Sequence, residues 1–304
     1  MRLAKISVLG AGNVGGSTAA AIATRRLGEV FLYDAVDGLA EGKAMDISHA
    51  AAHFHSISPI RGCEDLDELD GTDVFVISAG SPRKAGMTRA DLLESNLQVL
   101  RELCNALLPA SPDATVLIIT NPVDVLTAHV AREWPERTIL GLGCSLDTVR
   151  LQYFLAAEAE VAVDCVDALV IGTHNNQMVP LVGHARIGGA AASTVLSPEQ
   201  IQRACDHTRS AGADIVARLK TRGSFYAASY CACEIVEAIV RDTRDVFPLS
   251  VPCRGAYGYD DVTLALPCAV GHAGAERVIE IQLTAEERTA LDACAETLRA
   301  ALDS

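Results

Sequence analysis

The side chains best suited to acid–base chemistry are His174, which follows the apolar run LVIGT, and the pair Asp147 and Arg150 in SLDTVR. Near neutral pH an imidazole takes up and releases a proton, and a guanidinium presents a planar fork that fits a carboxylate. On the helix predicted over 146–159, Asp147 and Arg150 share one face. Each feature also has an ordinary interpretation, since a histidine after a strand is commonly a turn residue and an i, i+3 pair is commonly a surface ion pair.

Basic and amide side chains follow two of the apolar runs. The run 73–80 ends in SAG and leads into SPRKAGMTR, which contains Arg83 and Arg89, and the run 115–120 is followed by Asn121. Parallel sheets bind ligands at the carboxyl ends of their strands, so two arginines and an amide there suit a small anion. Solvated loop charge and an ordinary Asn-Pro turn are the alternative interpretations.

A glycine-rich turn, GAGNVG at 10–15, lies directly after a predicted strand and opens a predicted helix. In this context GxGxxG lets the backbone approach a pyrophosphate at a helix N-terminus. Asp34 ends the next strand, 19 residues beyond Gly15. A carboxylate there accepts both ribose hydroxyls of NAD and repels the 2′-phosphate of NADP, so the motif predicts NAD. The alternative is a structural turn with a surface aspartate.

Near-continuous apolar runs alternating with helical patterns are typical of a sheet that is covered on both faces. The predicted strands are 5–10, 29–34, 73–80, 115–120 and 138–143, and the predicted helices among them include 14–27, 38–52 and 89–108. Beyond about 144 the pattern changes to helix 146–159, strand 165–171, a turn-rich stretch 183–193, helices near 198–220 and 225–242, a hairpin-like region and a final helix 284–302. We therefore expect an α/β protein, with a Rossmann-type doubly wound parallel sheet in residues 1–143 followed by an α+β substrate domain in 144–304.

The charge balance limits the classes of partner. The 304 residues include 25 Lys and Arg against 39 Asp and Glu, a net charge of −14. This balance argues against a nucleic-acid partner, whose phosphates need basic residues, but local arginines still suit a small anion. We find no signal-peptide layout and no apolar run of about 18 residues that would predict a membrane span.

The ten cysteines are scattered, and Cys231 and Cys233 lack the spacing of zinc ligands. They indicate reduced thiols in a cytoplasmic protein and no metal site.

The order of these motifs is more specific than any one of them. GxGxxG, the strand-end aspartate, SAG-SPRKAGMTR, TNP, LDxxR and GTH follow one another as they do in the lactate/malate dehydrogenase family, which the chain resembles over nearly its whole length. The likeness is strongest to the malate dehydrogenases of the lactate-dehydrogenase-like group, and it includes DAVDGLAEGKAMD at 34–46 and EIVEAIVRD at 234–242. It implies an NAD-dependent oxidoreductase that interconverts L-malate and oxaloacetate in the tricarboxylic acid cycle.

The resemblance also implies roles for the residues above. His174 would exchange the proton while the nicotinamide exchanges the hydride, and Asp147 would orient the imidazole. Arg150 would hold the substrate 1-carboxylate, and Arg89 would polarise the carbonyl when the loop closes. Asn121 would contact both substrate and cofactor. The positions that correspond to the cofactor-binding residues of the family are Gly10, Gly12, Asn13, Val14, Gly15, Asp34, Ala79, Gly80, Asn96, Ile119 and Asn121.

Arg83 occupies the position that separates the two activities, because lactate dehydrogenases generally carry a neutral Gln there. A second substrate carboxylate entering a closed pocket is costly unless a cation meets it. Ser224, in GSFYAAS, aligns with a small residue that lines the same pocket. The resemblance further implies a homodimer or homotetramer, with the helix near 38–52 packing on a partner.

The segment after the histidine departs from the family pattern. The family usually has His-Gly-Asp, whereas this chain has His174-Asn175-Asn176-Gln177 before MVP. The amides remove negative charge near His174 and leave open a different second anionic group, such as a sulfonate. A dehydrogenase for another dianion or a lactate-like acid, and a non-catalytic NAD-binding protein, remain the alternatives. An NAD-dependent glycosidase is disfavoured because the metal-binding Cys and His of that group are not seen.

Overall fold

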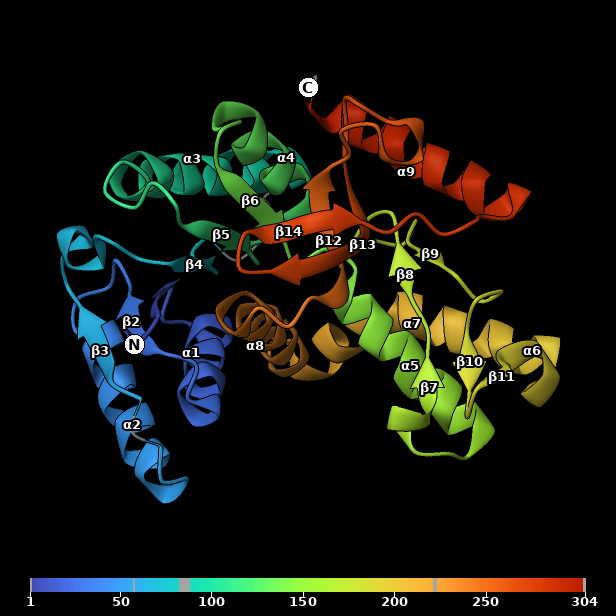
Figure 1. The fold of residues 1–304 in the computed structure, drawn as a ribbon, viewed down its shortest axis with the longest axis horizontal. Coiled ribbons are helices and arrows are strands. Elements are labelled where there is room, and N and C mark those ends of the chain that lie inside the picture. Colours follow the sequence, from blue (N-terminus) through green and yellow to red (C-terminus); the bar gives the residue numbers. More distant parts are fainter. Residues whose placement is uncertain (1, 57, 82–87, 221–222, 303–304) are drawn as a thin grey trace. The chain divides into compact units, whose positions relative to one another are not determined.

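The computed structural model describes residues 2–56, 58–81, 88–220 and 223–302 (Figure 1). The chain packs as two compact units. The first unit comprises Met1–Leu142, Phe225–Val246 and Ala269–Arg277, and the second comprises Gly143–Ser224, Phe247–Cys268 and Val278–Ser304.

The first unit contains the doubly wound parallel sheet that the sequence predicts. Its elements are β1 (Lys5–Leu9), α1 (Asn13–Arg25), β2 (Glu29–Tyr33), α2 (Leu39–His53), β3 (Ile60–Cys63), β4 (Val74–Ile77), α3 (Arg89–Leu107), β5 (Thr115–Ile118), α4 (Val123–Glu133) and β6 (Thr138–Gly141), joined by α8 (Tyr226–Arg241). Strands lie in the order β6-β5-β4-β1-β2-β3 and all pair in parallel. Every residue of β4 and β5 is buried, as expected for strands with helices on both faces.

The strand order reverses between β1 and β4, so this unit has a topological switch point there. From β1 the chain builds outward through β2 and β3, then returns to the other side of β1 and builds through β4, β5 and β6. The register aligns Leu9 with both Tyr33 and Ile77, which brings the carboxyl ends of the three strands together. Ligands of open α/β sheets bind outside the strand ends at this point.

Strand β3, with the sequence IRGC, was not predicted. Its exposed Arg61 breaks the apolar pattern, and Gly62 is required by packing rather than by strand propensity. A Cβ atom on Gly62 would lie 2.3 Å from the backbone of Glu41 in α2, so the glycine lets this helix approach the sheet edge.

Helix α8 packs with the first unit. The compact units therefore do not coincide with the single predicted boundary between residues 143 and 144. Ser229 of α8 donates its hydroxyl hydrogen bond to the Val14 carbonyl, and Arg25 of α1 forms an ion pair with Glu237 at 2.8 Å. These contacts reach back some 210 residues along the chain, a separation that sequence patterns do not encode. The functional division into 1–143 and 144–304 stays a prediction.

The second unit is the expected mixture of helices and short strands. Its elements are α5 (Ser145–Ala159), β7 (Val166–Asp167), β8 (Val170–Ile171), β9 (Val179–Pro180), β10 (Arg186–Ile187), β11 (Ala190–Ala191), α6 (Ala192–Val195), α7 (Pro198–Leu219) and α9 (Ala285–Leu302). The chain passes between the units within β12 (Asp245–Pro252) and β13 (Thr263–Gly271) and again at the end of β14 (Gly274–Val278). Helix α5 packs on α7, and its apolar face, including Leu151 and Leu155, lies in a buried cluster with Val166 and Val170.

The single strand predicted over 165–171 is wrong. The segment forms β7 and β8, which belong to different small sheets, since β7 pairs with β10 and β8 pairs with β9. Ala168, between the two strands, is buried although it belongs to neither strand. Its burial extends the apolar run, and the sequence therefore resembled one continuous strand.

None of the ten cysteines, all of which lie within the described residues, forms a disulfide. Cys165 is exposed and the other nine are buried. Burial raises the pKa of the Cys104, Cys233, Cys253 and Cys268 thiols to about 12, so these side chains stay protonated and act as small apolar groups. No helix in the described part of the chain is both long and apolar enough to cross a bilayer.

Candidate active site

The glycine-rich turn between β1 and α1 has the local geometry that a pyrophosphate requires. Gly10 adopts a φ of +99°, and a Cβ atom there would lie 2.8 Å from the Ala79 backbone nitrogen. Gly12 begins α1 without a side-chain cap, no acidic residue occupies the first turn, and a Cβ atom on Gly12 would meet nothing within 4 Å. The start of this helix thus has no side-chain cap and lies beside open space at Gly12, which fits a bound phosphate anion.

Asp34, directly after β2, is placed beside this turn. Its Oδ2 atom accepts a hydrogen bond from the Ala11 N–H at 2.6 Å, and its Oδ1 atom accepts one from the Val36 N–H at 2.9 Å. The cavity next to it is lined by Asp34, Asp37, Glu41 and Glu64 together with Tyr33 and Cys63. A ribose hydroxyl can donate to such carboxylates, whereas a 2′-phosphate would face four of them.

We expect the wild-type protein to prefer NADH to NADPH by about 100-fold in kcat/KM, which corresponds to about 2.7 kcal/mol. Asp34→Asn removes the charge but keeps one acceptor for the Ala11 N–H, so the preference should narrow by about tenfold. Steady-state kinetics with both cofactors measure this ratio. Asp37→Asn, which removes a charge from the same cavity without touching the glycine-rich turn, is the matched control, and an equal effect in both variants would contradict a specific role of Asp34.

Residues after β4 and β5 are connected through Asn96, which is buried in α3. The Oδ1 atom of Asn96 accepts from the Ser81 N–H at 2.8 Å, and its Nδ2 atom donates to the Asn121 carbonyl oxygen at 2.8 Å. A Cβ atom on Gly80 would lie 2.9 Å from Asn96 Oδ1, so this position needs glycine. Asn96 thus orders two strand-end loops at the switch point, and its direct contact with a cofactor stays a prediction.

The other predicted cofactor residues of the first unit lie at the same strand ends. The Ala79 carbonyl oxygen accepts a hydrogen bond from Thr120 Oγ1 at 2.7 Å, and Ile119 is buried with its N–H donating to the Ile77 carbonyl. Asn121 precedes a cis peptide bond to Pro122, and its Oδ1 atom lies 3.4 Å from the Val123 nitrogen.

Of the two predicted substrate arginines in SPRKAGMTR, only Arg89 lies within the described residues. Arg83 lies outside the described residues. Arg89 is the first residue of α3, as predicted, and the helix begins there because Thr88 and Asp91 form a capping box.

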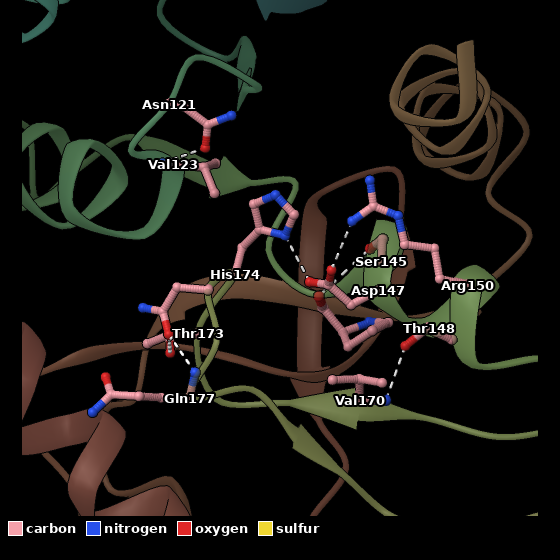
Figure 2. A network of polar contacts seen from close by, with 12 residues as sticks. Asn121, Val123, Ser145, Asp147, Thr148, Arg150, Val170, Thr173, His174 and Gln177 are labelled. Atoms are coloured by element: carbon pink, nitrogen blue, oxygen red, sulfur yellow. Dashed lines mark hydrogen bonds and ion pairs between the residues drawn. The ribbon is translucent and has the colours of Figure 1, made fainter. Parts of the chain in front are cut away.

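The second unit brings together the three residues predicted to handle the proton and the substrate carboxylate. His174 Nδ1 lies 2.6 Å from Asp147 Oδ2, and Arg150 donates from its NH1 group to Asp147 Oδ1 at 3.3 Å. Figure 2 shows both side chains directed at the carboxylate. The Asp147 side chain has no exposed surface, and the side chains of His174 and Arg150 are 19% and 12% exposed. This is a buried, shared carboxylate and not the surface ion pair that an i, i+3 spacing commonly produces.

The arrangement determines which histidine nitrogen changes its protonation. An ionised carboxylate accepts hydrogen bonds and cannot donate them, so Nδ1 carries a proton toward Asp147. With Nδ1 hydrogen-bonded to Asp147, a proton exchanged with a bound substrate would have to pass through Nε2.

Hydrogen bonds hold helix α5 on both sides of Asp147, at Cys144 before it and at Thr148 after it. Thr148 Oγ1 accepts a hydrogen bond from the Val170 N–H at 2.9 Å, which connects the helix to the strand that leads to His174 (Figure 2). Before the helix, the Cys144 N–H donates to the Pro248 carbonyl at 3.0 Å, and Gly143 has a φ of +54° with no room for a Cβ atom against the Ser250 nitrogen. Sequence patterns do not single out Thr148, since a threonine next to a candidate acid is too common to serve as a signal.

Ser224 lies in the segment just before α8 and is half-buried. Its predicted contact with substrate stays a prediction. Within the described residues no group of three His, Cys, Asp or Glu side chains is arranged to hold a metal ion.

Comparison with known proteins gives consistent matches over the whole chain. Residues 4–140 match the family model of the lactate/malate dehydrogenase NAD-binding domain, and residues 144–304 match that of the lactate/malate dehydrogenase alpha/beta C-terminal domain. The malate dehydrogenase of Roseiflexus sp. (strain RS-1) is 36% identical over 301 residues, which cover 98% of this chain and 97% of the relative.

Solved structures with both activities resemble the chain equally. The malate dehydrogenase of Cryptosporidium parvum aligns with a TM-score of 0.95 and 30% identity, over 100% of this chain and 98% of the other. The lactate dehydrogenase of Cryptosporidium parvum, solved with lactic acid and nicotinamide adenine dinucleotide, gives the same TM-score, identity and coverage.

Proposed function

Because the chain belongs to the lactate/malate dehydrogenase family, we propose that it is an NAD-dependent malate dehydrogenase that interconverts L-malate and oxaloacetate. The observation that carries the proposal is the buried carboxylate of Asp147, which His174 and Arg150 share. A fold retained only for binding NAD would have no use for a buried ion-pair network, whose desolvation is costly.

The chemistry divides between the cofactor and the chain. NAD supplies a hydride acceptor for alcohol oxidation, and its reduced form a hydride donor for ketone reduction. In ketone reduction the imidazolium of His174 donates the Nε2 proton to the carbonyl oxygen, and in alcohol oxidation the neutral ring takes the hydroxyl proton. Arg150 binds the 1-carboxylate of the substrate with its planar fork, and Asp147 keeps the ring oriented and stabilises its charge. The family resemblance further implies that Arg89 polarises the substrate carbonyl and that Asn121 and Ser224 each contact the substrate.

The choice of oxaloacetate over pyruvate follows from Arg83. The fold does not discriminate, since malate and lactate dehydrogenases superpose on the chain equally well. An arginine pairs with the second carboxylate of oxaloacetate and would be left without an anion beside the methyl group of pyruvate. Unpaired polar groups of this kind discriminate by about 10⁴-fold, far more than one methylene group does.

The test is the initial rate of NADH oxidation with oxaloacetate, pyruvate, 2-oxoglutarate and sulfopyruvate. We expect oxaloacetate to lead pyruvate in kcat/KM by about 10³-fold or more, and Arg83→Gln to reduce that lead by about 100-fold. Lys84→Gln, next to Arg83 in the sequence, is the matched control and should leave the order of substrates unchanged.

Other outcomes would contradict parts of the proposal. If sulfopyruvate or 2-oxoglutarate leads, the enzyme acts on another dianion, and the amides after His174 are the first candidates for the altered specificity. If no keto acid is reduced although NADH binds, the protein is a binding protein and the catalytic proposal is wrong.

We further propose a cytoplasmic homodimer or homotetramer that acts in the tricarboxylic acid cycle. Met45 on α2 is 55% exposed and Phe54, at the end of that helix, is 54% exposed, which supports a partner on the helix predicted to pack in an oligomer. The absence of disulfides among ten described cysteines supports a reducing compartment.

A further inference from the structure

The loop that carries His174, residues 173–178, is organised by Asn175. The Asn175 Oδ1 atom accepts hydrogen bonds from the Gln177 N–H at 2.7 Å and from Thr173 Oγ1 at 3.2 Å. The backbone of Asn175 adds two more, because its N–H donates to the Thr173 carbonyl at 2.9 Å and its carbonyl accepts from the Met178 N–H at 3.0 Å. Asn175 therefore connects the residue before His174 with the two residues at the far end of the loop.

The same loop rests on a buried residue of α9, the C-terminal helix. Cys294 Sγ lies 3.3 Å from the Gln177 carbonyl oxygen and 3.5 Å from Thr173 Oγ1. Gly172, with a φ of +96°, passes so close that its Cβ atom would be 2.9 Å from Cys294 Sγ. Strand β13 holds the residue from the other direction, through paired backbone hydrogen bonds between Gly172 and Ala265 at 2.8 Å. The base of the loop is thus held by Cys294 and Ala265, and beyond His174 the Gln177 N–H is held by the Asn175 side chain.

We propose that Asn175 is a positioning residue for His174. Its side-chain oxygen accepts the hydrogen bond of the Gln177 N–H in place of a backbone carbonyl. This bond closes the turn that holds the imidazole 2.6 Å from Asp147. Without this acceptor the backbone on the C-terminal side of His174 gains freedom, and the ring is held in place less often. Displacement of a reacting group by about 1 Å can lower a rate by about 100-fold. The proposal rests on the proposed function, and it gives the departure from His-Gly-Asp a mechanical role.

Two variants of Asn175 and one of its neighbour test the proposal. At saturating oxaloacetate and NADH, we expect Asn175→Ala to lower the stopped-flow rate of hydride transfer by about 10- to 100-fold, with KM changed by less than about threefold. Asn175→Asp keeps an acceptor oxygen at the same place and should restore the rate to within about threefold of wild type. Asn176→Ala is the matched control, since the Asn176 amide is exposed and takes part in none of the hydrogen bonds described for this loop.

A second readout does not require turnover. Hydrogen–deuterium exchange in a peptide containing Gln177 and Met178 should become about tenfold faster in Asn175→Ala and stay at the wild-type rate in Asn176→Ala, because only the first variant removes a partner of the Gln177 N–H. Melting temperatures of all three variants check that they fold.

The outcomes separate this proposal from the proposed function. If wild-type protein reduces none of the keto acids, the proposed function is wrong, and the exchange experiment alone decides whether Asn175 organises the loop. If Asn175→Ala folds and transfers hydride at the wild-type rate, or if Asn175→Asp is as slow as Asn175→Ala, the positioning role is wrong. The positioning role is supported if hydride transfer is slow in Asn175→Ala, is restored in Asn175→Asp and is normal in Asn176→Ala.

Discussion

Replacement of Asp147 by Asn is expected to lower kcat for oxaloacetate reduction by about 10³- to 10⁴-fold. The Asp147 carboxylate is fully buried and accepts from His174 and Arg150, so the variant keeps the shape of the side chain and loses its charge. The His174 ring then faces the Arg150 cation without an anion between them. An amide can also present its NH₂ group to Nδ1, which would favour the wrong tautomer of the neutral ring.

The measurement is kcat as a function of pH for Asp147→Asn, His174→Asn and the double variant. We expect Asp147 to act through His174, so the double variant should be only about twofold slower than His174→Asn alone. Independent contributions that multiply in the double variant would contradict this coupling. Glu158→Gln is the control, since Glu158 lies on the same helix and pairs with Arg203 at the surface, where an ion pair contributes little. NADH affinity, measured by fluorescence, should be unchanged in all of them.

The parts of the fold that local patterns encode could be predicted from the sequence. The five predicted strands of the first half start within one residue of β1, β2, β4, β5 and β6, since buried parallel strands are continuous apolar runs. Their predicted ends are one to three residues too long. The predicted runs continue past the last strand residue, for example from Ile77 into Ser78-Ala79-Gly80, because these residues follow the strand and line the glycine-rich turn.

The contacts of the candidate site depend on residues that are far apart in sequence. Asp147 and His174 are 27 residues apart, and nothing in their spacing predicts a 2.6 Å contact; the family resemblance supplied the pairing. The contact between the His174 loop and Cys294, which lies 121 residues after Thr173, could not be predicted from any sequence pattern. Asp34 was predicted as a ribose ligand, yet its hydrogen bond to Ala11 N–H, which orders the glycine-rich turn, follows only from the structure.

Gly15→Ala is expected to destabilise the protein strongly even without cofactor. The new Cβ atom would lie 1.7 Å from the Gly10 carbonyl oxygen and 2.6 Å from Ser78 Oγ, so α1 must move away from the sheet. Overpacking of this kind costs about 3 kcal/mol, near the upper end of its usual range. For a protein of this size that corresponds to a fall in Tm of roughly 6–12 °C, measurable by calorimetry on the cofactor-free protein.

Gly12→Ala separates packing from cofactor binding within the same motif. Gly12 has a φ of −67°, and a Cβ atom added there would have no neighbour within 4 Å, so alanine fits the cofactor-free protein at a cost of no more than about 1 kcal/mol for a poorer helix cap. The added methyl group would occupy the space into which we expect the pyrophosphate to fit, and NADH affinity should fall by about 30-fold or more, equal to about 2 kcal/mol. Titration calorimetry with NADH measures this loss.

If Gly12→Ala bound NADH normally, or if it destabilised the cofactor-free protein as much as Gly15→Ala does, the three glycines would be needed for packing alone. The opposite pattern, with Tm lost at Gly15 and affinity lost at Gly12, follows only if the turn is built around a ligand that approaches its backbone.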